Sequence, residues 1–297
     1  MSGSFRSWVP PLAACLVLLV GVAAAVGWRL AGSPVVATAY ADLPSAELAL
    51  PPAPAAVEPA TPPEPPAVPD PSRPAVALVV TGLGLAARPT AAAIALPEAV
   101  ALAFSPYARD LRQGLAEAAA AGHEVLLELP VEPADTATAD AGPLALHSEL
   151  DGQALAARVQ DVVGGNAAVA GAVAEAGGFA ARPDRFAGAA AALAARGLVL
   201  LQLGGEELGA TARDVALPFA AVEGPLDAEL DPVAIDRSLA ALEAEARSRG
   251  FAVGFVRPYP LSLERVARWA AGLPAAGLNL VAPGRRLRAH GAEASAG

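Results

Sequence analysis

The stretch AVALVVTGLG at residues 75–84 decides the fold of this chain. Six apolar residues follow Pro74 without interruption and end at Thr81 and Gly82. A short Val-rich run bounded by proline and glycine is typical of a strand buried on both faces. Such strands form parallel sheets covered by helices, and α/β proteins keep their functional groups at the carboxyl ends of these strands. Thr81 and Gly82 therefore occupy a functional position, although neither is an acid, a base at neutral pH or a good metal ligand.

The chain from residue 75 onward alternates between strand-like and helix-like segments. Strands are predicted over residues 76–80, 99–104, 124–129, 168–173, 198–203, 252–255 and 278–281, with a weaker candidate at 217–222. Helices are predicted over residues 88–96, 110–121, 150–163, 183–196, 232–249 and 261–271. The clearest of them, at 232–249, has Asp231 as its cap and Gly250 as its stop. The alternation indicates a parallel sheet, and seven or eight such βα units favour a barrel over an open sheet.

Two segments of different composition precede this globular part. The apolar stretch at residues 9–28 lies between Arg6 and Arg29 and has the length of one membrane-spanning helix. We expect a transmembrane signal anchor there, with residues 1–8 in the cytoplasm, and a cleaved signal peptide is the alternative. A Pro/Ala-rich linker follows at residues 29–74, where the prolines prevent a helix or a central strand. The sequence thus predicts an extended spacer between a membrane and the domain.

Composition and motif spacing exclude several classes of function. The net charge of −10 argues against nucleic acid as a partner, because phosphate contacts need a basic surface. The three histidines show no zinc-like spacing, which argues against a zinc site. Ser105 and Ser148 lack a Gly-x-Ser-x-Gly context, so a serine hydrolase has no support. His123 precedes a predicted strand, on the side opposite the functional edge, so we expect a structural or surface residue there and not a ligand.

Residues 122–133 read GHEVLLELPVEP, which resembles the segment G-H-E-V-L-L-H-L-P-M-E-P of the divergent polysaccharide deacetylases. The VVTGLG at residues 79–84 is similar to the I-I-D-D-L-G of this bacterial envelope family, and the resemblance extends over residues 75–288. It implies a deformed (β/α) barrel of about seven strands. It also implies a carbohydrate deacetylase, in which a divalent cation held by Asp and His polarises an acetyl carbonyl and activates water. A neighbouring Asp would take the proton.

This chain departs from the family at each position that carries the chemistry. The family's two aspartates fall on Thr81 and Gly82, and its histidines fall on Glu128, Glu175 and Phe255. Its D-S-R-T segment falls on residues 202–205. The resemblance therefore implies the family's fold with its metal and catalytic motifs lost. We expect no catalytic residue, no metal ligand and no cofactor.

The polar side chains that remain near the predicted strand ends form a candidate pocket of Thr81, Glu128, Glu132, Glu175, Gln202 and Arg257. Three carboxylates at one barrel mouth could hold a hard cation. The favoured interpretation is that Glu132 caps a loop while Glu128 and Glu175 face water. Arg257 is the best surviving group for a carboxylate or a sugar hydroxyl, although it could equally pair with a structural acid.

The sequence favours a membrane-anchored, envelope-facing deacetylase-like domain at residues 75–288. This domain would be catalytically degenerate and would bind a glycan or an envelope protein. The alternative is an active hydrolase that removes acetyl groups from envelope polysaccharide through a site rebuilt around the glutamates, and a purely structural spacer is a third class. The expected location is the bacterial inner membrane, in a single pass with the domain in the periplasm. Residues 289–297 are expected to form a disordered tail.

Overall fold

The computed structural model describes residues 72–137 and 139–296, with side chains up to residue 289. The predicted anchor at residues 9–28 and nearly all of the linker at 29–74 lie outside the described residues. No helix of the described part is both long enough and apolar enough to cross a bilayer.

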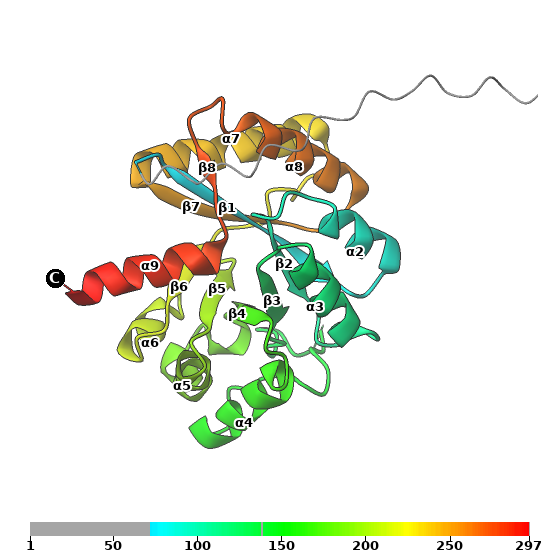
Figure 1. Cartoon of the computed structure of the whole chain (residues 1–297). Coiled ribbons are helices and arrows are strands. Elements are labelled where there is room, and N and C mark those ends of the chain that lie inside the picture. Colours follow the sequence, from blue (N-terminus) through cyan, green and yellow to red (C-terminus); the bar gives the residue numbers. More distant parts are fainter. Residues whose placement is uncertain (1–71, 138, 297) are drawn as a thin grey trace, which may run out of the picture. The chain divides into compact units, whose positions relative to one another are not determined.

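Strands and helices alternate along the described chain (Figure 1). The strands are β1 (Ala75–Leu83), β2 (Ala101–Phe104), β3 (Val125–Glu128), β4 (Val169–Glu175), β5 (Val199–Leu203), β6 (Phe219–Val222), β7 (Phe251–Val256) and β8 (Asn279–Leu280). The α-helices are α2 (Ala87–Ile94), α3 (Leu111–Ala120), α4 (Gly152–Val163), α5 (Ala187–Ala195), α6 (Gly209–Asp214), α7 (Pro232–Arg249), α8 (Pro260–Gly272) and α9 (Pro283–Ala296). Two 3-10 turns, η1 (Gly177–Phe179) and η2 (Pro183–Phe186), precede α5.

The strands form one curled, wholly parallel sheet in the order β6-β5-β4-β3-β2-β1-β7, and the short β8 pairs with the start of β1. No ladder joins β6 to β7 within the described residues. A hydrogen bond from the Leu226 amide to the Phe255 carbonyl, at 2.9 Å, links β7 to the segment after β6. The architecture is therefore a curled half-barrel of the α/β class, and the seam between β6 and β7 is what separates it from a closed barrel.

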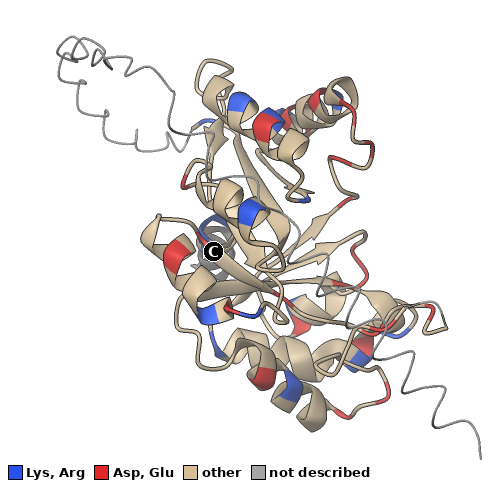
Figure 2. Cartoon of the chain, turned by 90° about the vertical axis from the view of Figure 1, so that its right-hand side faces the viewer, with Lys and Arg blue, Asp and Glu red and all other residues tan. Residues whose placement is uncertain are grey.

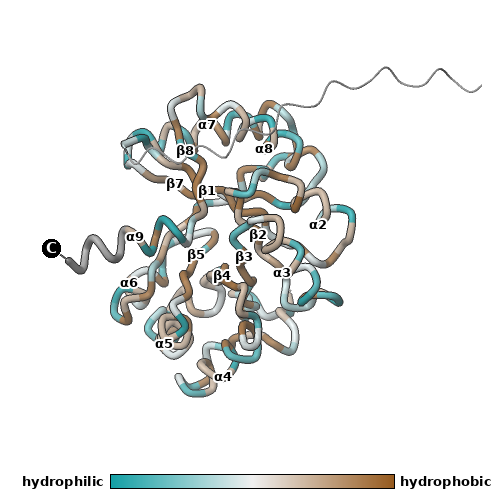
Figure 3. Tube along the Cα trace, in the orientation of Figure 1, coloured by the Kyte–Doolittle hydropathy of each residue, from teal (hydrophilic) through white to brown (hydrophobic). Residues whose placement is uncertain are grey.

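Two apolar clusters lie on opposite faces of this sheet. The larger one includes Val76, Leu78 and Val80 of β1 together with residues of the surrounding helices. The smaller one includes Val79 and is built from alternate residues of the strands, inside the curl. Successive side chains of a strand point to opposite faces, which explains how β1 serves both clusters. In Figure 3 the hydrophobic colour accordingly runs along strands such as β1 and β4.

Helix α9 continues past residue 289, where a disordered tail was predicted. The Glu124 carboxylate, just before β3, accepts hydrogen bonds from the amides of Gly284 (2.6 Å) and Arg285 (3.0 Å) in the first turn of α9. An anion at a helix N-terminus is stabilising because it meets unpaired N–H groups and the positive end of the helix dipole. Leu287 of α9 packs against the inner apolar cluster. The start of α9 is thus held by a distant carboxylate, a contact that the polar composition of this segment does not reveal.

Candidate functional site

Three predicted pocket residues lie on the inner face of the sheet at its carboxyl edge. Thr81, Glu128 and Glu175 each follow a residue of the inner apolar cluster by two positions along their strands. Side chains two residues apart in a strand share a face, so these three point into the mouth of the half-barrel. Ser105, which is buried, follows Ala103 of β2 in the same way.

Glu128 reaches across the mouth and binds the backbone of β1. Its Oε1 accepts a hydrogen bond from the Gly82 amide at 2.5 Å. Strand β2 lies between β1 and β3, and the small side chain of its inward residue Ala103 leaves room for this contact. Gly82 has a φ of 73°, a conformation that glycine adopts without strain. A carboxylate from β3 thus occupies the position beside β1 where the resemblance placed an acidic pair.

The surroundings of Glu128 disfavour its charge. Burial raises the pKa of the Glu128 carboxyl above its usual range, the Gly82 hydrogen bond opposes the shift, and the neighbouring Glu175 carboxylate adds to it. Glu175 itself is exposed at the end of β4. Glu128 is therefore largely shielded from water, whereas Glu175 is exposed.

Thr81 is buried and hydrogen-bonded within the sheet. Its side chain is 7% exposed, and its hydroxyl donates to the Val256 carbonyl of β7 at 3.3 Å. This contact ties together two neighbouring strands at their carboxyl ends. Thr81 thus supplies a structural hydrogen bond at the mouth.

Glu132 lies in the loop after β3 and holds a second loop. Its Oε1 accepts the Ser148 amide at 2.9 Å, and its Oε2 lies 3.1 Å from Nδ1 of His147. Burial acts to raise the pKa of Glu132, but hydrogen bonds from Ser148 and the interaction with His147 outweigh it and leave the pKa lowered. Glu132 therefore does not join Glu128 and Glu175 in one carboxylate cluster.

Gln202 points away from the mouth. It follows Leu201 of the inner cluster directly, so it lies on the outer face of β5, where it is fully buried. Its Oε1 accepts the Leu208 amide at 2.8 Å, and its Nε2 donates to Glu207. The side chain organises the loop after β5 and does not belong to the pocket.

Arg257 is the first residue beyond β7, and a buried acid fixes its position. Asp227, which has no exposed surface, accepts hydrogen bonds from the Arg257 amide at 3.0 Å and from the Ser262 hydroxyl at 2.7 Å. The Arg257 guanidinium lies 3.4 Å from the Asp227 carboxylate and donates through Nη2 to the Asp227 carbonyl at 2.6 Å. The guanidinium also lies over the Tyr259 ring, 5.0 Å from its centroid. Sequence reasoning missed Asp227, because nothing in the loop after β6 marks it as a partner of Arg257.

The residues at the family's histidine positions, Glu128, Glu175 and Phe255, do not form a metal site in the described structure. Phe255 is 8% exposed within the inner apolar cluster. His123 is buried, and its two ring nitrogens lie 2.8 Å and 2.9 Å from the carbonyls of Val100 and Ile94. Among the described residues, no three or more His, Cys, Asp or Glu side chains gather in a way that could hold a metal ion. The donor set at the mouth therefore does not fit the divalent cation of the family, which needs at least three protein ligands.

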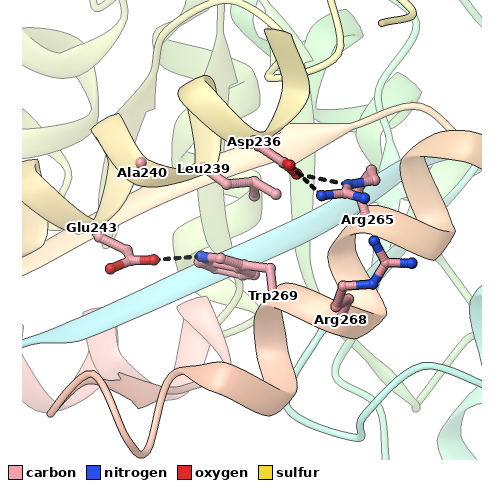
Figure 4. A pocket seen from close by; sticks show the side chains of 7 residues that line it. All are labelled: Asp236, Leu239, Ala240, Glu243, Arg265, Arg268 and Trp269. Carbon is pink, nitrogen blue, oxygen red and sulfur yellow. Dashed lines mark hydrogen bonds and ion pairs between the residues drawn. The ribbon is translucent and has the colours of Figure 1, made fainter. Parts of the chain in front are cut away.

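A hollow of about 170 Å³ lies between α7 and α8 (Figure 4). Its polar walls are already paired: Arg265 binds Asp236, and Nε1 of Trp269 donates to Glu243 at 3.0 Å. The hollow lies between two helices that cover the sheet, so it is separate from the mouth.

Charged residues are distributed over the whole domain. In the view of Figure 2, arginines and acidic residues are interspersed along the helices and loops. Such a distribution, together with the net charge of −10, gives no support to a nucleic-acid interface.

Comparison with known proteins agrees with the resemblance noted in the sequence. A model of the family described as "divergent polysaccharide deacetylase" matches residues 78–286. The uncharacterized protein ATU2773 from Agrobacterium tumefaciens C58 is similar in structure, with a TM-score of 0.67 and 27% sequence identity over 72% of this chain and 89% of that one. The lactam utilization protein from Thermus thermophilus gives a TM-score of 0.45 at 17% identity, over 71% of this chain and 99% of that one. A search of curated proteins found no match. Because the family model matches most of this chain, the chain belongs to the divergent polysaccharide deacetylases.

Proposed function

We propose that this protein is a membrane-anchored, envelope-facing relative of the carbohydrate deacetylases that binds glycan without hydrolysing it. The observation that carries the proposal is the state of the barrel mouth. The Thr81 hydroxyl donates to a carbonyl of the neighbouring strand β7, and Gly82 has no side chain. The Glu128 carboxylate accepts a hydrogen bond from the Gly82 amide. A deacetylase of this kind needs an ion held by several ligands and a base beside the attacking water. Among the described residues, the mouth has too few ligands to hold such an ion.

The carboxyl edge of the sheet nevertheless has the character of a binding surface. The large apolar side chains that are exposed in the described residues are Leu85, Tyr107, Leu230, Val233 and Tyr259. All of them lie on the segments that follow β1, β2, β6 and β7, at this one edge. Apolar groups gathered around a polar centre are typical of interaction sites. Aromatic rings at such a rim suit the apolar faces of sugar rings, which supports a glycan over an envelope protein as the ligand.

The test is a titration of the domain with acetylated chitooligosaccharides, followed by NMR. We expect shifts in amides of the β1–α2 and β7–α8 loops and no release of acetate over hours. The same spectra report both properties, so binding and turnover are measured on one sample. Absence of binding to any acetylated or deacetylated oligosaccharide would refute the glycan ligand and would favour an envelope protein partner.

The proposed location follows from the sequence at residues 9–28 and from the linker that follows it. We expect a single pass with the domain in the periplasm. Protease added to spheroplasts should then digest the domain while the inner membrane stays intact. Full protection of the domain would contradict this topology.

One observation favours an active hydrolase as the second candidate. Glu128 is a mostly buried carboxyl with a raised pKa next to Glu175, and environments that push the pKa of a carboxyl upward suit a general acid. Acetate release that is lost in Glu128→Gln and retained in Glu149→Gln, a change at an exposed glutamate on the surface, would establish this alternative.

A further inference from the structure

The position of Arg257 suggests a more specific ligand than a neutral glycan. We propose that Arg257 and Tyr259 form a subsite for a carboxylate group carried by a sugar, so that the bound glycan is an acidic one. This inference rests on the proposed function, because it names the class of glycan that the mouth would take.

The first step of the argument is that the Arg257 side chain is held in place before any ligand arrives. Asp227 is fully buried and fixes the Arg257 amide, while Ser262 satisfies the same carboxylate. The guanidinium contacts Asp227 through Nε and Nη2. A group fixed in this way loses little conformational entropy when it binds a ligand. Asp227 is therefore a positioning residue for Arg257.

The second step concerns what the guanidinium still offers. Nη1 has no acceptor among the described residues, and the Arg257 side chain is 40% exposed at the end of β7. An unpaired guanidinium nitrogen is a strong donor to an anionic oxygen. Because Nε and Nη2 already donate to Asp227, the free N–H groups lie mainly on Nη1, which suits one carboxylate better than a phosphate held by several donors.

The third step is the aromatic ring beside the cation. Tyr259 is 37% exposed, and the guanidinium lies 5.0 Å from the centroid of its ring. Gly82 lies close to the same loop, because a Cβ built on it would be 3.7 Å from Cδ of Pro258. The cation and the ring are thus adjacent to the mouth, not on a distant surface. A hexuronic acid unit has an apolar ring face and a carboxylate. The Tyr259 ring could pack on that face while the Arg257 guanidinium binds the carboxylate.

The experiment is isothermal titration calorimetry with oligogalacturonate and with its carboxyl-reduced counterpart, a matched neutral oligosaccharide. The full chain in detergent is used for every titration. We expect the acidic oligomer to bind about tenfold or more tightly than the reduced one, as a charged hydrogen bond allows. Arg257→Gln should abolish that difference. Arg268→Gln, at an exposed arginine of α8 that pairs with Glu264, is the matched control and should keep the difference.

Two further measurements make the outcome unambiguous. Arg257→Lys keeps the positive charge but loses the planar set of guanidinium donors, so it should retain only part of the preference for the acidic oligomer. Thermal unfolding of each variant reports whether its fold is intact. Equal binding of the two oligomers, or a preference that survives Arg257→Gln, would overturn the inference. Inorganic phosphate that displaces the bound acidic oligomer at concentrations below that of the oligomer would overturn the inference as well. Binding of acetylated chitooligosaccharides to the same preparation separates these outcomes from a failure of glycan binding altogether.

Discussion

Replacing Glu128 tests the contact that distinguishes this mouth from a metal site. Alanine removes both the charge and the acceptor of the Gly82 amide, whereas glutamine removes the charge and keeps an acceptor in place. Loss of the acceptor leaves a partly buried N–H unpaired, which should lower the free energy of unfolding by about 1–3 kcal/mol in Glu128→Ala. Glu128→Gln should avoid this cost.

The effect of Glu128→Gln should depend on pH, and the sign follows from the pKa of Glu128. That pKa is raised in the folded protein, mainly by burial, so the native state binds the proton more tightly than the unfolded chain does. The free energy of unfolding therefore falls as pH rises from the ordinary glutamate pKa through the raised one. Glutamine does not ionise and escapes this loss. The stability of Glu128→Gln relative to the wild type should thus increase between pH 4 and pH 8.

Urea denaturation at several pH values between pH 4 and pH 8 measures this difference directly. The control is Glu149→Gln, because the Glu149 side chain is 84% exposed and its replacement should change stability by less than about 0.5 kcal/mol at every pH. A stability difference between Glu128→Gln and the wild type that stays constant across this range would refute the assigned environment of Glu128.

Three other predictions concern the fold and the loops. Leu127→Ala, in the fully buried centre of β3, should cost about 2–5 kcal/mol, whereas Leu85→Ala, at a side chain that is 64% exposed, should cost less than about 0.5 kcal/mol in the same denaturation assay. Glu132 has a lowered pKa, so its charged form stabilises the folded protein and Glu132→Gln should lower the free energy of unfolding at neutral pH. This loss of stability should shrink as pH falls through the pKa of Glu132, and a loss that does not depend on pH would contradict the lowered pKa. Glu124→Ala should speed amide exchange in α9 but not in α4, and unchanged protection of α9 would mean that the carboxylate does not hold the helix.

Local signals in the sequence were enough to predict most of the strands and helices. The prediction of a helix at residues 232–249 is confirmed in α7, because Asp231 accepts the amides of Val233 and Ala234 and Gly250 ends the helix with a φ of 79°. The strand predicted over residues 76–80 is confirmed as part of the longer, buried β1 (Ala75–Leu83), whose apolar residues serve both faces of the sheet. Such features depend on neighbours in the chain, which is why they are visible without a structure.

The candidate pocket was harder to predict because its contacts join distant segments. The sequence predicts Gln202 at the mouth, but its position next to Leu201 places it on the outer face of β5. The link between Asp227 and Arg257 crosses the seam of the sheet and leaves no trace in residue spacing. Whether a polar residue near a strand end enters the mouth is decided by strand register and by loop packing, and neither can be read from composition.

Zinc binding at equilibrium tests the central claim most directly, namely that the family's fold is kept here without its metal site. The purified protein would be dialysed against zinc, and the metal retained per chain would be measured. We predict no stoichiometric zinc and no difference between the wild type and Glu128→Gln. One zinc ion per chain that is lost in Glu128→Gln and retained in Glu149→Gln would contradict the account and would favour an active hydrolase.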